Sequence, residues 1–195
     1  MILKHNYYYF IKAIPIKTCK KILKACHKKT IKQARTKQGI DDPIRDCKVA
    51  WINDKWIYDI LNPFIHEANK KAGWNFQWDW NEDCQFTIYK KGHYYGWHTD
   101  QGTNYLKHKS KHINGKERKL SLTLQLTDKT KYEGGDFQFK WIQDENNEVE
   151  VTTVDNAKDI GTIIIFPSFI YHQVIPITKG KRESLVNWSI GSAFT

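Results

Sequence analysis

Hydrophobic and polar positions follow a helical period in the first part of the chain. Residues 18–36 place apolar groups three and four positions apart with lysines between them, and Thr18 is a suitable N-cap, so we expect an amphipathic helix there. Its apolar positions are Cys19, Ile22, Leu23 and Cys26. Residues 53–73 repeat the pattern and end at Gly73, and Pro63 inside this segment predicts a kink or two short helices.

After about residue 83 the period changes to two. Several short segments alternate apolar with polar residues, and Gly, Asn or Asp clusters separate them, which predicts strands. The segments are CQFTIYK, YYGWHTD, KLSLTLQL, GDFQFKW, VEVTTV, GTIIIFPS and SLVNWSIG. GTIIIFPS is continuously apolar, so we expect a buried central strand. Seven strands that follow a helical N-terminal part of the chain predict a mainly β fold, which is a sandwich or barrel buttressed by helices.

The composition indicates one globular domain. The chain has 195 residues, 40% of them hydrophobic, and we divide it into a helical support region, residues 1–82, and a β core, residues 83–195. The four cysteines form no Cys-x-x-Cys pair, which favours reduced thiols in an intracellular, cytoplasmic protein. The N-terminus lacks the features of a secretory signal, and no segment approaches the roughly 20 apolar residues of a membrane span.

The positive charge is concentrated at the N-terminus. The formal net charge is +10, and residues 1–40 hold ten Lys and one Arg without Asp or Glu, so this segment carries +11 and the remainder −1. Attraction to an acidic partner such as nucleic acid is one interpretation. A solvated helix face is the other, and it is favoured because the chain has 27 Lys against four Arg, whereas base and phosphate recognition relies more on Arg.

Candidate metal chemistry lies on the predicted strands. His98 and Asp100 are two positions apart, so on an extended chain both side chains reach the same side. His172 completes a set of two histidines and one carboxylate, which holds Fe(II) on one face and leaves positions open for co-substrate and oxygen. Arg182 follows ten residues later with Ser184 on the same strand face. A guanidinium beside a hydroxyl suits a carboxylate, such as the distal carboxylate of 2-oxoglutarate.

Three stretches carry a resemblance to a known family: QFTIYKKGHYYGWHTD, RKLSLTLQLTDKTKYEGGDFQF and GTIIIFPSFIYHQVIPITKGKRESLVNWSIG. Over roughly residues 45–194 the chain resembles the Fe(II)- and 2-oxoglutarate-dependent oxygenases. Within them it is similar to the prolyl 4-hydroxylase-like branch, which includes small bacterial and phage proteins grouped with proline and lysine hydroxylases.

The resemblance implies a double-stranded β-helix core, also called a jelly roll or cupin-like fold. It implies His98, Asp100 and His172 as iron ligands and Arg182 as the anchor for the distal carboxylate of 2-oxoglutarate. Tyr89 falls where this branch commonly has a tyrosine that hydrogen-bonds 2-oxoglutarate, and Ser184 is a weaker match. The implied cofactors and co-substrates are Fe(II), 2-oxoglutarate and O2, with ascorbate as an additional reductant.

The implied activity is hydroxylation of a C–H bond coupled to conversion of 2-oxoglutarate to succinate and CO2. We expect a prolyl residue in a peptide or protein as the substrate, with a free amino acid or another small molecule as the alternative. An oxygenase acting on nucleic acid is a further alternative, which the absence of any arginine after Arg182 makes weaker. A binding module that keeps the fold without turnover is the alternative outside the enzymes.

Overall fold

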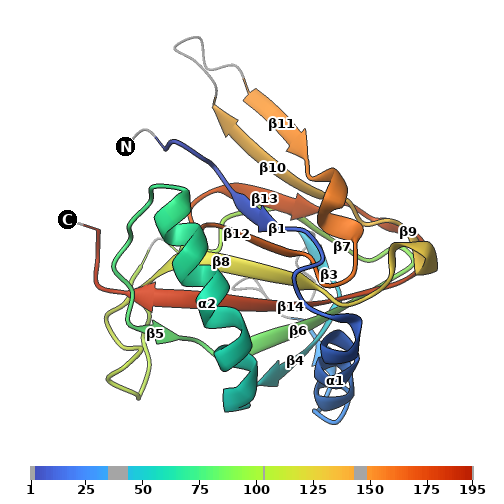
Figure 1. The fold of residues 1–195 in the computed structure, drawn as a ribbon, viewed down its shortest axis with the longest axis horizontal. Coiled ribbons are helices and arrows are strands. Elements are labelled where there is room, and N and C mark those ends of the chain that lie inside the picture. Colours follow the sequence, from blue (N-terminus) through green and yellow to red (C-terminus); the bar gives the residue numbers. More distant parts are fainter. Residues whose placement is uncertain (1–2, 35–43, 103, 143–148, 195) are drawn as a thin grey trace.

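Two antiparallel sheets face each other in the computed structural model, which describes residues 3–34, 44–102, 104–142 and 149–194 (Figure 1). The larger sheet runs in the order β1 (Tyr8–Phe10), β12 (Ile163–Pro167), β8 (Glu117–Gln125), β14 (Ile177–Gly191), β6 (Cys84–Lys90), β4 (Lys48–Ile52) and β2 (Lys32–Gln33). Two short strands, β5 (Trp80–Asn81) and β9 (Tyr132–Gly134), also pair with β14. The smaller sheet runs in the order β11 (Val149–Thr153), β10 (Phe137–Ile142), β13 (Tyr171–Val174), β7 (Tyr94–His98) and β3 (Arg45–Asp46). This arrangement is a double-stranded β-helix, as expected.

The first helix, α1 (Ile16–Cys26), begins earlier and ends sooner than predicted. The Pro15 carbonyl accepts hydrogen bonds from the backbone N–H groups of Thr18 and Cys19, so Thr18 lies inside the first turn and is not the N-cap. The chain leaves the helix after Cys26 and enters β2, so the lysine-rich end of the predicted segment is not helical. Residues 35 and 36 of that segment lie outside the described residues.

The second helix, α2 (Lys55–Lys71), is one helix of 17 residues and not two short ones. Pro63 lies within it and is exposed, so the Asp59 carbonyl that loses its helical hydrogen bond can be hydrated. The helix is followed by Gly73 with φ of 73°, a left-handed conformation that confirms the predicted stop. Neither described helix is long and apolar enough to cross a membrane.

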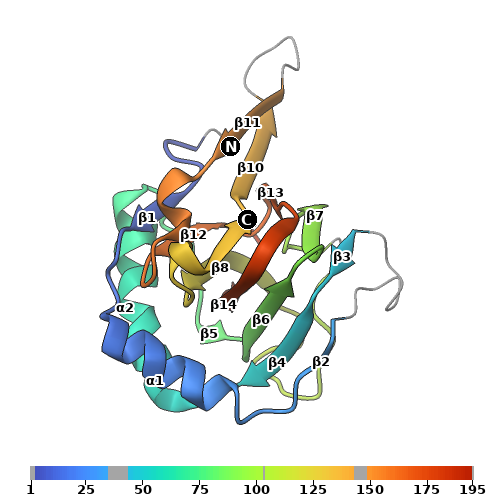
Figure 2. The same ribbon diagram turned by 90° about the vertical axis from the view of Figure 1, so that its right-hand side faces the viewer.

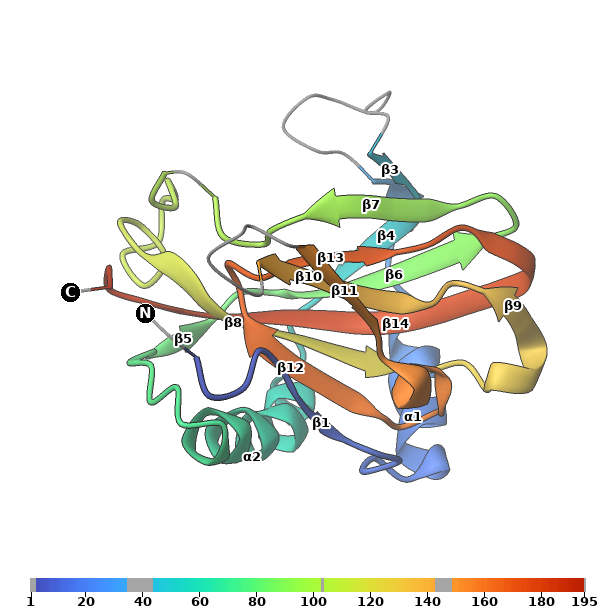
Figure 3. The ribbon, with the colours of Figure 1, turned by 90° about the horizontal axis from the view of Figure 1, so that it is seen from above.

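The central strands β6, β8 and β12 of the larger sheet are buried on both faces along most of their length. Both helices lie on one side of this sheet and the smaller sheet lies on the other (Figure 3). Alternation with period two sends Phe86, Leu122 and Leu185 into the core shared with the helices, where they meet Ile57 and Leu61. The opposite face meets a second core, built around Phe137, Phe139, Phe166, Val174 and Ile177.

The face of the larger sheet that looks towards the smaller sheet carries an unusual number of buried polar side chains. They are Gln85, Thr87, Ser121, Thr123, Gln125, Arg182 and Ser184. Because burying a polar group without a hydrogen-bond partner is costly, such a concentration marks a functional site better than the apolar core does.

All seven predicted strand segments contain strands, namely β6, β7, β8, β10, β11, β12 and β14. GTIIIFPS contains β12, which is buried throughout and lies between β1 and β8, so its prediction as a buried central strand is confirmed. The prediction missed β13, which carries His172, and the short strand β9. It also missed the five short strands β1 to β5 in residues 1–82.

Candidate active site

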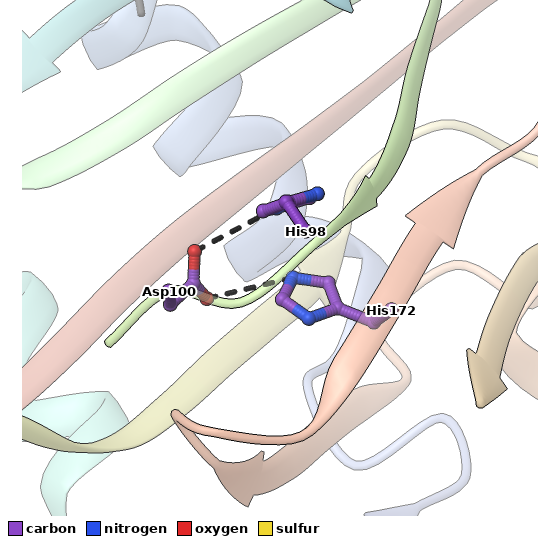
Figure 4. A group of neighbouring side chains, drawn as sticks. All are labelled: His98, Asp100 and His172. Carbon is purple, nitrogen blue, oxygen red and sulfur yellow. Dashed lines mark ion pairs between the residues drawn. The ribbon is translucent and has the colours of Figure 1, made fainter. Parts of the chain in front are cut away.

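Two histidines and an aspartate converge between the sheets (Figure 4). His98 is the last residue of β7, Asp100 follows two positions later, and His172 on β13 is the cross-strand partner of His98. Asp100 places Oδ1 3.8 Å from Nε2 of His98 and Oδ2 3.5 Å from Nε2 of His172. Potential ligand atoms of all three residues lie within 4.8 Å of one another, and the side chains are nearly buried.

Backbone carbonyls orient both imidazoles. Nδ1 of His98 lies 2.7 Å from the Gly96 oxygen, and Nδ1 of His172 lies 3.0 Å from the Ile170 oxygen. A carbonyl only accepts, so each Nδ1 carries the proton and each Nε2 presents its lone pair towards Asp100. Burial, together with His172, lowers the pKa of His98 to about 3, so this ring is neutral near pH 7. A carboxylate and two inward lone pairs fit a divalent transition metal.

Asp100 is held in place from its backbone as well as its side chain. Its N–H and that of Gln101 both donate to the Ser168 carbonyl, at 2.9 and 2.8 Å. Burial alone would raise the pKa of Asp100, but His172, His98 and Arg118 lower it to about 2. The carboxylate is therefore ionised at neutral pH.

Arg118, at the start of β8, connects Asp100 to the rest of the fold. Its Nε and Nη2 donate to the two carboxylate oxygens of Glu82 at 2.5 and 3.0 Å, and its Nη1 donates to the Asp100 carbonyl at 3.3 Å. The guanidinium carbon also lies 3.8 Å from the ring centroid of Trp188. Arg118 is therefore a positioning residue for Asp100.

Aromatic rings fix the two histidines from the sides. Tyr95 stacks on His98 with ring centroids 3.4 Å apart and an interplanar angle of 13°. Phe166 and Phe137 lie against His172 at 4.6 and 5.6 Å between centroids. These contacts restrict the ring orientations that the carbonyls select.

A buried arginine lies at another part of the same cavity. Arg182 on β14 is 2% exposed, and its Nη1 donates to Ser184 Oγ at 3.2 Å. Burial raises the pKa of Tyr132, and the Arg182 guanidinium opposes that rise, while Gln125 donates to the Tyr132 hydroxyl at 3.1 Å. Among the described residues no Asp or Glu forms an ion pair with Arg182, so this buried cation has room for an anionic ligand.

Tyr89 is the cross-strand partner of Arg182 and also lines the cavity. It is 4% exposed, and burial raises its pKa, so its hydroxyl keeps its proton. The guanidinium carbon of Arg182 lies 5.6 Å from the Tyr89 ring centroid. The cavity thus brings together every site residue expected from the sequence: Tyr89, His98, Asp100, His172, Arg182 and Ser184.

Sequence reasoning did not single out Tyr95, Arg118 or Tyr132 for a role in this site. Tyr132 directly precedes the EGGDF turn, and Arg118 is one of only four arginines and directly precedes a predicted strand. Rarity of Arg in a lysine-rich chain was the one signal available for Arg118. Trp188 on β14 also lines the cavity.

Comparison with known proteins now gives the family. Residues 84–190 match the 2OG-Fe(II) oxygenase superfamily, which is more than half of the chain. The chain belongs to this superfamily. Membership implies Fe(II), 2-oxoglutarate and O2 as cofactor and co-substrates, and the site residues of this oxygenase fit the first two: three convergent donors for the metal and an unpaired buried cation for a carboxylate.

Relatives and structural neighbours are of the prolyl hydroxylase-like type. The oxygenase is 31% identical over 100 residues to a PKHD-type hydroxylase of Idiomarina loihiensis, covering 51% of this chain and 38% of that protein. It is 34% identical over 105 residues to a PKHD-type hydroxylase of Xylella fastidiosa, covering 53% and 42%. The chain therefore matches about two fifths of the length of these curated relatives.

Two solved structures share the fold. A prolyl-4-hydroxylase of Pseudomonas putida superimposes with a TM-score of 0.71 at 17% identity, covering 95% of this chain and 92% of that one. A prolyl hydroxylase of Trichoplax adhaerens, solved with a peptide fragment of the hypoxia inducible factor oxygen degradation domain, gives a TM-score of 0.70 at 16% identity, covering 94% and 83%.

Proposed function

We propose that this chain is an Fe(II)- and 2-oxoglutarate-dependent dioxygenase that hydroxylates a prolyl residue in a peptide or protein. The observation that carries the proposal is one cavity that holds both the cluster of His98, Asp100 and His172 and the guanidinium of Arg182, which forms no ion pair within the described part of the chain. The prolyl hydroxylases among the structural neighbours, one of them holding a peptide, support the choice of substrate.

In this proposal His98, Asp100 and His172 hold Fe(II), which together with 2-oxoglutarate activates O2 for hydroxylation of a C–H bond. The carbonyls of Gly96 and Ile170 keep each Nδ1 protonated, so both Nε2 atoms remain available to the metal. Arg118 keeps Asp100 oriented and ionised.

Arg182 and Ser184 would bind the distal carboxylate of 2-oxoglutarate through charge-assisted and neutral hydrogen bonds. The Tyr89 side chain lies on the same wall, and Tyr132 interacts with the Arg182 guanidinium. The aromatic rings of Tyr95, Phe137 and Phe166 make the cavity wall around the two histidines apolar.

Anaerobic titration of the Fe(II) protein with 2-oxoglutarate tests the co-substrate assignment without knowledge of the substrate. A weak visible charge-transfer band from the chelated 2-oxo acid is the expected result. Arg182→Ala should require about 10- to 150-fold more 2-oxoglutarate, because a buried charge-assisted contact contributes roughly 1.5–3 kcal/mol. Lys179→Ala is a matched control, since Lys179 lies on the same strand but is exposed and paired with Glu133.

A folded, iron-loaded protein that shows no band would refute the co-substrate assignment and leave a binding module as the better explanation. If the band appears, proline-containing peptides are screened by mass spectrometry for the gain of one oxygen atom and for equimolar succinate. Retention of that activity by His172→Ala would contradict the assigned ligand set. Omission of ascorbate from the same assay tests whether it serves as the additional reductant.

We also propose that residues 1–82 support a catalytic region formed by residues 83–195 in one domain. The shared core supports this, because helix residues such as Ile57 and Leu61 pack with Phe86 and Leu185 of the sheet. A cytoplasmic location is consistent with four cysteines that are all free and buried.

A further inference from the structure

An open groove lies beside the metal cavity, between the margin of the larger sheet and β3. We call it the β2–β4 groove; its lining includes Lys29, Lys32, Gln33, Arg45, Trp51 and Gln85. Figure 2 shows β2 and β4 at the margin of the larger sheet, with α1 next to them. The groove has a volume of about 930 Å³, far more than a single amino acid needs. Gln85 lines both the groove and the metal cavity, so the two spaces adjoin.

Arg45 is buried at the inner end of the β2–β4 groove without a full set of partners. It is 9% exposed, its Nε donates to the Cys47 sulfur at 3.1 Å, and its buried Nη2 has no hydrogen-bond partner among the described residues. The guanidinium carbon lies 4.4 Å from the ring centroid of Tyr95, whose other neighbour is the metal-site residue His98. One aromatic ring therefore separates this unsatisfied cation from the proposed iron centre.

A second unsatisfied donor lies where the cavity meets the groove. Trp188 is 4% exposed and lines the metal cavity, and its Nε1 has no partner in the part of the chain that the structure describes. Trp51 packs near it at 6.1 Å between ring centroids and is itself 49% exposed in the groove. An occupant that lies in the groove and reaches into the adjoining cavity would meet the exposed indole of Trp51 and two buried donors, which favours a ligand rich in hydrogen-bond acceptors.

The charges around the groove are positive in excess. Asp54 pairs with Lys29 at 3.1 Å, and Asp46 accepts a hydrogen bond from Gln33. Neither Lys32 nor Arg45 forms an ion pair with an Asp or Glu of the described residues. No acidic residue is among the described residues that line the groove, so it complements a carboxylate.

We propose that the β2–β4 groove binds an acidic stretch of the peptide substrate, with Arg45 receiving a carboxylate next to the residue that is oxidised. The size of the groove and its exposed indole select an extended peptide over a free amino acid, and Lys32 attracts a further acidic residue nearer the solvent. This inference rests on the proposed function, which places the residue that is oxidised at the metal cavity. It adds that the peptide around that residue is acidic.

Two fluorescein-labelled peptides of nine residues test the proposal. Both have a central proline, one carries glutamates on either side, and the other carries glutamines at the same positions. Binding to the protein loaded with Fe(II) and 2-oxoglutarate is followed anaerobically by fluorescence anisotropy, so no turnover is required. The wild type should bind the glutamate peptide at least about 10-fold more tightly, as expected for a charge-assisted hydrogen bond in a buried site.

Arg45→Gln should bring the two peptides close to equal affinity, and Lys32→Gln should reduce the preference by about 2- to 3-fold. Lys70→Gln, an exposed lysine on α2, is the control and should leave the preference unchanged. Equal affinities in the wild type, or an undiminished preference in Arg45→Gln, would overturn the proposal. Displacement of the peptide by equimolar free glutamate would overturn the choice of a peptide.

The 2-oxoglutarate titration of Arg45→Gln keeps the two proposals apart. An unchanged charge-transfer band supports a role for Arg45 towards the substrate, whereas a weakened one assigns Arg45 to the co-substrate and overturns the proposal. Loss of the band in the wild type would refute the proposed function while the anisotropy still reports on the groove. If Arg45→Gln does not fold, the proposal is judged from two other results. These are the preference of the wild type for the glutamate peptide and the reduction of that preference in Lys32→Gln.

Discussion

Replacing Arg118 by glutamine should weaken metal binding and lower stability through two separable effects. The first follows from the bond between Arg118 Nη1 and the Asp100 carbonyl, because loss of a residue that orients a metal ligand typically costs about 10- to 100-fold in metal affinity. The second follows from Glu82, whose carboxylate loses both guanidinium hydrogen bonds. The side chains of Arg118 and Glu82 are 21% and 16% exposed. We therefore expect the free energy of unfolding to fall by about 2–4 kcal/mol, which is slightly less than for fully buried ion pairs.

The double variant Glu82→Gln with Arg118→Gln separates these effects. It removes the carboxylate that the single variant leaves unpaired, so most of the stability should return, while Asp100 still lacks its positioning bond. Urea unfolding followed by tryptophan fluorescence measures the stability, and Co(II) titration followed by visible absorption measures the metal site. Glu82→Gln alone is the matched control for changes at the carboxylate.

The reasoning is refuted if metal affinity returns together with stability in the double variant. That result would mean that Arg118 acts on the metal site only through the integrity of the fold. A single Arg118→Gln variant with unchanged Co(II) affinity would contradict the positioning role directly.

Three further outcomes follow from the structure. His172→Ala should remain folded and lose Co(II) binding by more than about 100-fold, and a variant that still binds Co(II) tightly would remove His172 from the ligand set. Gly135→Ala should lower the free energy of unfolding in urea by about 2–3 kcal/mol, because φ is +64° and a Cβ would lie 2.3 Å from Ile177 Cδ1. It should also weaken 2-oxoglutarate binding, because the same Cβ would lie 3.3 Å from Arg182 Cδ. Gly92→Ala is the control: φ is +85° but the space around it is open, so the free energy of unfolding should fall by only about 1 kcal/mol. Burial raises the pKa of Cys26 and of Cys84 to about 12. Above roughly pH 8.5 the unfolded chain therefore releases thiol protons that the folded chain keeps. The free energy of unfolding should then fall with rising pH by up to about 1.4 kcal/mol per pH unit for each thiol. Cys84→Ala should reduce that slope in urea unfolding, and an unchanged slope would contradict this account.

The strands that build the site could be predicted because their pattern is local. In β6, Phe86 and Ile88 face the helices while Thr87 and Tyr89 face the cavity, and this alternation is visible in the sequence. The strand β13 escaped prediction because four residues, YHQV, are too few to show a period, and its position depends on pairing with β7 and β10. His172 was nevertheless found from its residue type and from the neighbouring buried strand.

Residues whose roles depend on contacts across the fold were not predictable in the same way. Arg118 and Glu82 are 36 positions apart, and nothing in the local sequence of either announces the pair. The cap of α1 was wrong for a simpler reason: Thr18 is a good N-cap by type, but the Pro15 carbonyl already accepts the first hydrogen bonds of the helix. Propensity gives the kind of element, and hydrogen bonds decide where it begins.

The three arginines of the described residues show how charge is distributed around the site. In a chain with 27 lysines, Arg182 lines the cavity, Arg45 lines its groove, and Arg118 stacks on Trp188 of the cavity wall. A planar guanidinium can be buried there and still donate several hydrogen bonds. Only Arg118 has a carboxylate partner, Glu82, so two buried cations remain without a protein anion among the described residues. In the proposed function the distal carboxylate of 2-oxoglutarate neutralises one of them, Arg182. The other, Arg45, lies on the opposite side of Tyr95 from His98, which leaves it for an anion that arrives with the substrate.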